Sequence, residues 1–119
     1  MTPLFITDWE LAQWGRRALD LGQMVAELYM LKHYKGIDAG LWIIEGFANG
    51  YASIPERRAF RTLIHAGVHL ITFGSQVPGW GSKEQAMDLI KVGRDLLLDA
   101  SKMEKEVFRG GPWECFFEL

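Results

Sequence analysis

The sequence repeats one short pattern three times, a serine or threonine followed three residues later by a glutamate or glutamine. The pairs are Thr7 with Glu10, Ser53 with Glu56, and Ser82 with Gln85. In such a capping box the hydroxyl accepts a hydrogen bond from the later amide, and the later side chain accepts one from the first amide. Apolar residues three and four positions apart follow each box, which is the periodicity of an amphipathic helix. The chain is therefore expected to be built from helices that begin just after these boxes.

Four helices follow from this periodicity and from the residues that stop it. Gly36 ends the first, and the sequence RGGP ends the last, because glycine and proline do not continue a helix. The expected helices cover about residues 8–34, 39–49, 54–74 and 83–108.

The segment 39–49 fits two structures. Its glycines weaken helix propensity, and its apolar residues would also suit a short strand near 41–45, which would make the fold α+β. No second stretch with clear alternation is available to pair with such a strand, and a lone strand is not stable. Helix is therefore preferred. Gly46 and Gly50, one turn apart, would then allow a neighbouring helix to approach closely.

The third expected helix fixes the centre of the fold. From Leu63 onward it is apolar nearly all round, which is typical of a helix buried on most sides. A chain of 119 residues is long enough for one core, and no linker or internal repeat divides it. We therefore predict an all-α, compact single-domain four-helix arrangement over residues 1–119, with an aromatic C-terminal tail.

Charge and cysteine content narrow the class of protein. Thirteen basic and fifteen acidic side chains give a formal net charge of −2, so binding to duplex nucleic acid is disfavoured. The longest charge-free stretch, residues 62–82, is interrupted by glycines and a proline and does not suit a membrane span. The N-terminus does not resemble a signal peptide, and Cys115 has no second cysteine to pair with. We expect a cytoplasmic protein with no membrane partner and no cofactor.

His65 and His69 stand four residues apart, a spacing that puts two imidazoles on one face of a helix. A metal site needs three or four ligands, and the glutamate of a zinc-protease helix is absent between them. The preferred interpretation is a pair of core histidines that are hydrogen-bonded to a partner such as Glu45. Metal binding by His65 and His69 remains a minor alternative.

Arg57, Arg58 and Arg61 lie in the first turns of a helix, where the macrodipole already presents positive charge. Three cations there disfavour the helix unless something negative neutralises them. The acids considered within the chain are Glu56, Glu45 and Asp38. A phosphate or another small anionic ligand outside the chain is the alternative, since arginine at a helix start suits an anion.

Aromatic residues outside the helices are candidates for partner binding. Trp80 lies between two glycines in a loop, and Trp113, Phe116 and Phe117 follow the last helix break. Tryptophan is enriched in interface hot spots, and the tail is too short to form a core of its own. It packs either along its own helices or across a partner surface, which would be another protein or a second copy in a homodimer.

Catalytic motifs are not apparent. No serine sits in a nucleophile elbow, and no paired carboxylates or phosphate-binding glycine loop are recognisable. We therefore predict a non-enzymatic small binding protein that acts through protein–protein recognition, as an inhibitor, adaptor, immunity or phage-type accessory protein. The alternative is a helical protein that binds a nucleotide or other anion at Arg57, Arg58 and Arg61. A metal-dependent activity that uses His65 and His69 ranks third.

Overall fold

The computed structural model describes residue 3 and residues 17–50 and 54–119 of the chain, and these contain four α-helices and no strand. The all-α, four-helix prediction is confirmed. Residues 41–45 are helical, so the α+β alternative is wrong. The elements are α1 (Arg17–Lys35), α2 (Ala39–Gly50), α3 (Glu56–Thr72), α4 (Lys83–Ser101) and the short 3-10 helices η2 (Gly74–Gln76), η3 (Lys105–Phe108) and η4 (Glu114–Phe116).

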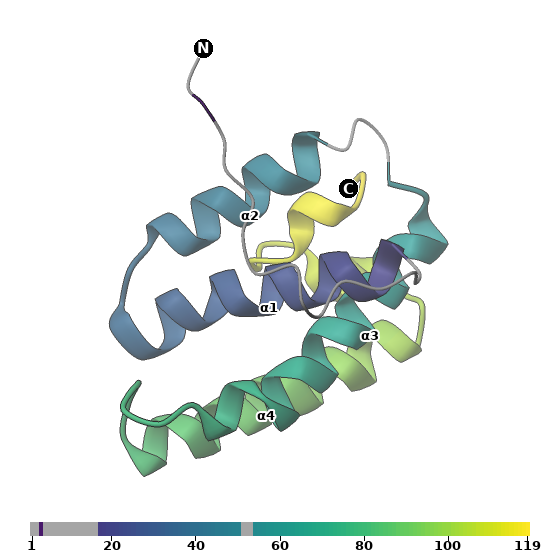
Figure 1. Ribbon diagram of the computed structural model, residues 1–119. Helices are drawn as coiled ribbons and strands as arrows, with labels where there is room; N and C mark the ends of the chain where they lie inside the picture. Colours follow the sequence, from purple (N-terminus) through teal and green to yellow (C-terminus); the bar gives the residue numbers. More distant parts are fainter. Residues whose placement is uncertain (1–2, 4–16, 51–53) are drawn as a thin grey trace.

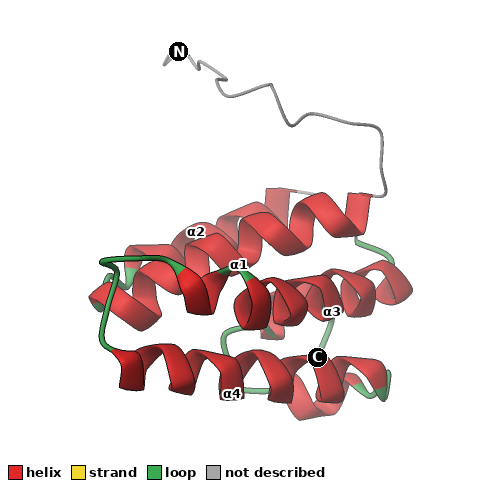
Figure 2. Cartoon of the chain, turned by 60° about the horizontal axis from the view of Figure 1, so that its bottom comes forward, coloured by secondary structure: helices red, strands yellow, loops and turns green. Residues whose placement is uncertain are grey.

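The four helices are stacked in the spatial order α2, α1, α3, α4 (Figures 1 and 2). Helix α3 packs extensively against both α1 and α4, while α2 packs against α1 and against η4 of the C-terminal tail. The central position predicted for the third helix is therefore confirmed. Among the described helices, none is long and apolar enough to cross a membrane.

Close contact between helices is made by glycines other than the two that the sequence suggested. A Cβ placed on Gly67 of α3 would lie 2.7 Å from the carbonyl oxygen of Gly93 in α4, and one on Gly93 would lie 2.7 Å from that of Gly67. These two helices can therefore approach only where both side chains are absent. No described residue lies within 4 Å of a Cβ placed on Gly46 or Gly50 of α2, so the close approach expected there is not found in the described part of the chain.

One predicted capping box is present in full, at the start of α4. The Gln85 amide donates to Ser82 Oγ at 3.1 Å, and the Ser82 amide donates to Gln85 Oε1 at 2.8 Å. Helix α3 begins later than expected, because its N-cap is Pro55, which has no side-chain cap. A box from Ser53 to Glu56 therefore does not start this helix. Ser53 itself, and the box at Thr7, lie outside the described residues.

The last helix is shorter than the predicted 83–108. Helix α4 ends at Ser101, and Met103 has a φ of 58°, in the left-handed region that stops a right-handed helix. After this reversal Phe108 in η3 is buried and stacks on Phe117 with the ring centroids 5.3 Å apart. The apolar residues that continued the helical period past residue 101, Met103 and Val107, are both about half exposed, and the buried residue of this segment is Phe108, which reaches the core through the turn.

Candidate functional site

The start of α3 and the start of the described part of α1 border one cavity of about 870 Å³. It is lined by four arginines, Arg17, Arg57, Arg58 and Arg61, together with His65 and apolar side chains that include Ile64. The sequence singled out three of these arginines. It missed Arg17, because no local pattern links residue 17 to residues that lie some forty positions later.

The parallel packing of α1 and α3 explains how Arg17 joins the others. A Cβ on Gly22 would lie 2.6 Å from the Cβ of His65, Glu27 bonds to His69, and Tyr34 bonds to Gly74. These pairs advance along both chains in the same direction, so the two helices run parallel. Their N-terminal ends therefore lie side by side, which brings Arg17 beside the first turns of α3.

The acids that were expected to neutralise the arginines form no ion pair with them in the described part of the chain. Asp38 Oδ1 pairs with Lys32 Nζ at 2.6 Å, and Glu56 Oε2 pairs with Lys105 Nζ at 3.7 Å. Glu45 is exposed on α2. None of the ion pairs between described residues includes any of the four cavity arginines. The explanation by intramolecular pairing with these three acids is therefore not supported.

The start of α3 adds further positive potential to the cavity. Its first backbone hydrogen bond runs from the Ala59 amide to the Pro55 carbonyl at 2.9 Å. The preceding amides of the first turn have no acceptor within the helix, as at every helix start, and Pro55 provides no side-chain cap. The cavity is thus bordered by amides that have no acceptor within the helix, at the positive end of a helix dipole.

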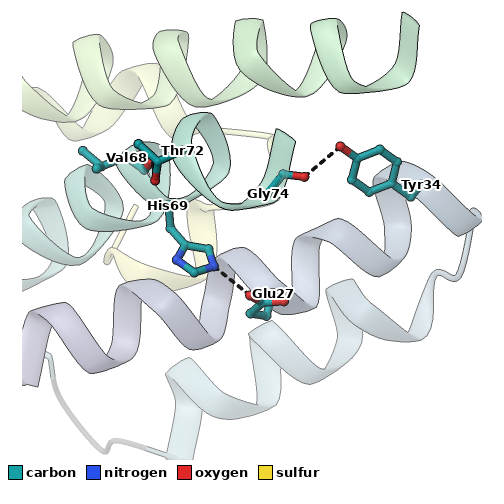
Figure 3. A network of polar contacts seen from close by, with 6 residues as sticks. All are labelled: Glu27, Tyr34, Val68, His69, Thr72 and Gly74. Carbon is teal, nitrogen blue, oxygen red and sulfur yellow. Dashed lines mark hydrogen bonds and ion pairs between the residues drawn. The ribbon is translucent and has the colours of Figure 1, made fainter. Parts of the chain in front are cut away.

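The two histidines have different surroundings, and Figure 3 shows those of His69. His69 Nε2 lies 2.7 Å from Glu27 Oε1, with the imidazole 12% and the carboxylate 53% exposed. His65 instead lines the arginine cavity. The partner of His69 is therefore Glu27, and the pairing expected with Glu45 is wrong. In the described part of the chain, no three His, Cys, Asp or Glu side chains are grouped so that they could hold a metal ion.

At the C-terminal end of the α1 and α3 pair, α1 contacts η2. The Tyr34 hydroxyl donates to the Gly74 carbonyl at 2.8 Å (Figure 3), and burial raises the pKa of this phenol. Nearby, His33 Nε2 lies 2.7 Å from the Gln85 carbonyl oxygen, which ties α1 to the start of α4. These polar contacts hold α1 against η2 and against the start of α4.

The aromatic residues predicted to bind a partner pack against their own chain. Trp80 is half-buried, with its ring 6.1 Å from that of Tyr34, and the Trp113 ring lies 5.1 Å from that of Tyr29. Phe116 is buried, and Phe117 packs on the core. Of the two arrangements left open for the tail, the structure shows packing along its own helices.

Cys115 lies in the same tail segment, and its surroundings do not activate it. Burial, together with the negative charge of Glu45, raises the pKa of this thiol to about 11. The thiol is therefore protonated at neutral pH and is a poor nucleophile there.

A second cavity, of about 430 Å³, lies between the end of α2 and the C-terminal tail. Its lining includes both Glu56 and Lys105, which pair with each other at 3.7 Å. Charges of both signs thus line this cavity, because Glu118 is present beside Glu56 and Lys105, whereas the lining of the arginine cavity, among the described residues, contains no acid.

Comparison with known proteins connects the chain to phosphotransferases. It is 35% identical to "Phosphotransferase FrzJ" of Cladobotryum sp over 112 residues, which are 87% of this chain and 28% of that protein. It is 25% identical to "4-hydroxytryptamine kinase" of Psilocybe cubensis over 99 residues, 82% of this chain and 27% of the relative. The kinase of the same name from Psilocybe cyanescens is 21% identical over 104 residues, 86% and 28% of the two chains.

The chain therefore spans between a quarter and a third of the length of these curated relatives. No family model and no solved structure matches it. The similar proteins are named for phosphoryl transfer, so the prediction of a non-enzymatic inhibitor or adaptor that acts through protein–protein recognition is wrong. The similarity points to an enzyme.

Proposed function

We propose that this chain forms the helical part of a phosphotransferase that moves a phosphoryl group to a hydroxyl-bearing small molecule. The observation that carries the proposal is the 35% identity to phosphotransferase FrzJ over 112 residues, nearly the whole of the chain. Two relatives named as kinases match over almost as much of it. The same region is thus shared by three proteins named for one reaction type.

The names of the two kinases suggest the acceptor. Both are named for 4-hydroxytryptamine, so the acceptor proposed for this protein is a small molecule that carries a hydroxyl on an aromatic ring. In the reaction, the acceptor oxygen bonds to phosphorus, the bond from that phosphorus to the donor breaks, and the hydroxyl proton is released. The donor proposed is a nucleoside triphosphate, and its diphosphate is the leaving group.

Because the chain spans 28% of phosphotransferase FrzJ, we propose the activity for this segment together with the remainder of such an enzyme. The segment contributes a packed helical body and a positively charged cavity. Catalysis of phosphoryl transfer depends mainly on positioning and on electrostatic stabilisation of the phosphate oxygens. The helical body would serve the positioning, and the positively charged cavity would serve the electrostatic stabilisation. The lone Cys115 and the composition also favour the cytoplasm as the location, which we propose with the function.

A chimeric enzyme tests the proposal. The matching segment of phosphotransferase FrzJ is replaced by the corresponding residues of this chain, and transfer of labelled phosphate to the natural acceptor of that enzyme is measured. We expect measurable transfer, and none from a FrzJ variant that lacks the segment. A chimera that folds, as judged by circular dichroism and a cooperative thermal transition, but transfers no phosphate would contradict the proposal.

A further inference from the structure

Four guanidinium groups converge on the cavity at the joint start of α1 and α3, and their convergence is set by packing. Gly22 of α1 lies against the His65 Cβ and the Thr62 carbonyl of α3, which fixes the register of the two parallel helices. Arg17 lies one to two turns before Gly22, and Arg61 lies one turn before His65. The arginines therefore meet because the helices cannot slide past one another at this contact.

Their positive charge is not balanced within the described part of the chain. None of Arg17, Arg57, Arg58 or Arg61 takes part in an ion pair there, and the described lining of the cavity has no carboxylate. Like charges at close range repel, and the amides at the start of α3, which have no acceptor within the helix, add to the positive potential. An anion in the cavity would remove this repulsion and would bind to preorganised donors.

Donor type and cavity size together define the anion. Guanidinium groups match the oxygens of a phosphate through paired hydrogen bonds. A volume of about 870 Å³ lies within the range of small-molecule sites, so it admits a phosphate with an organic group attached. The apolar side chain of Ile64 in the lining suits contact with such a group.

We infer that the cavity lined by Arg17, Arg57, Arg58 and Arg61 binds the phosphate of a small organic phosphate, either the polyphosphate of the donor or the phosphomonoester product. This inference deepens the proposed function, because it assigns to named residues the group that the enzyme transfers. It differs from the earlier ligand-binding hypothesis in adding Arg17 and in placing the site within an enzyme.

Calorimetric titration of the 119-residue chain at low ionic strength tests the inference. The probes are pyrophosphate, ATP and phenyl phosphate, each without metal. We expect saturable binding that weakens as sodium chloride is added, since the attraction is electrostatic. Tighter binding of ATP than of phenyl phosphate identifies the donor as the source of the phosphate, and the reverse order identifies the product.

Two matched double variants distinguish binding in the cavity from non-specific attraction of the probe to positive charge. Arg57→Gln with Arg61→Gln removes two cavity cations, both exposed, and is expected to weaken binding by about tenfold or more, as for charge-assisted hydrogen bonds. Arg94→Gln with Lys102→Gln removes two exposed cations of α4 and its C-cap, which pair with Asp95 and Asp99. This control changes net charge equally and should leave binding within about twofold of the original chain, since neither side chain lines the cavity and each is paired with an aspartate.

The inference would be overturned if none of the three probes bound saturably. It would also be overturned if both double variants weakened probe binding equally. Thermal unfolding of each variant confirms that the fold is kept. The result is separable from that of the chimeric enzyme. If the chimera is active but the chain binds no phosphate, phosphate binding in the cavity is refuted and the proposed function stands. If the chain binds phosphate but the chimera is inactive, the proposed function is refuted and phosphate binding in the cavity stands.

Discussion

Helices α2 and α3 are both rich in apolar residues, yet the structure uses them differently. Helix α3 lies between α1 and α4 and buries residues on most of its sides, including Phe60 at 2% exposure (Figure 2). Helix α2 lies at one side of the stack, and Trp42 is 70% exposed there. An apolar side chain thus contributes to stability according to what surrounds it, and its hydrophobicity alone does not say whether it is buried.

The largest expected effect comes from exchanging large aromatic side chains of the two helices for alanine. Phe60→Ala removes a fully buried ring that packs on Phe117 with centroids 4.9 Å apart. It should lower the free energy of unfolding by about 3–5 kcal/mol. Trp42→Ala should change it by no more than about 0.5 kcal/mol. Chemical denaturation measures both, and similar losses would show that the two helices are equally buried in solution.

A second exchange compares two neighbouring residues of α2 itself. Ile44 is fully buried and Ile43 is 49% exposed. Ile44→Ala should cost about 2–5 kcal/mol, whereas Ile43→Ala should cost well under about 1 kcal/mol. Thermal and urea unfolding of the two variants provide the measurement. A small loss for Ile44→Ala would mean that α2 does not pack on α1 as the structure shows.

The smallest expected effects, of opposite sign, come from glycines. Gly67→Ala in α3 would place a methyl group 2.7 Å from the Gly93 carbonyl oxygen, so it should destabilise the protein by about 1–3 kcal/mol. Gly46→Ala in α2 meets no described residue within 4 Å and should stabilise the protein by about 0.5–1 kcal/mol, because alanine favours the helix. Differential scanning calorimetry measures both shifts, and a stabilising Gly67→Ala would refute the close contact between α3 and α4.

Sequence reasoning succeeded where the interactions are local. The Ser82 box predicted the start of α4 to the residue, because its two hydrogen bonds join residues three apart. Sequence reasoning failed at the end of the same helix. The apolar period runs on to residue 107, but the chain reverses at Met103 so that Phe108 can stack on Phe117. A repeat of apolar residues does not reveal whether those residues are buried or whether the backbone between them stays helical.

The candidate site was recoverable in part for the same reason. Arg57, Arg58 and Arg61 are close in sequence, and their unusual place at a helix start was visible at once. Arg17 and the true partner of His69, Glu27, were not visible, because both depend on α1 lying parallel to α3. The acids expected to pair with the arginines were wrong for the same reason, because whether Asp38 and Glu45 reach them depends on how distant helices pack.

By itself the sequence determined four helices, an all-α class and a cluster of arginines at one helix start. These follow from hydrogen bonds and side-chain periodicities that act over three or four residues. Only the tertiary structure decided that α1 and α3 run in parallel, that Gly67 and Gly93 let α3 approach α4, and that a fourth arginine completes the cavity. Contacts between distant residues depend on how whole helix surfaces fit together, which no short stretch of sequence specifies.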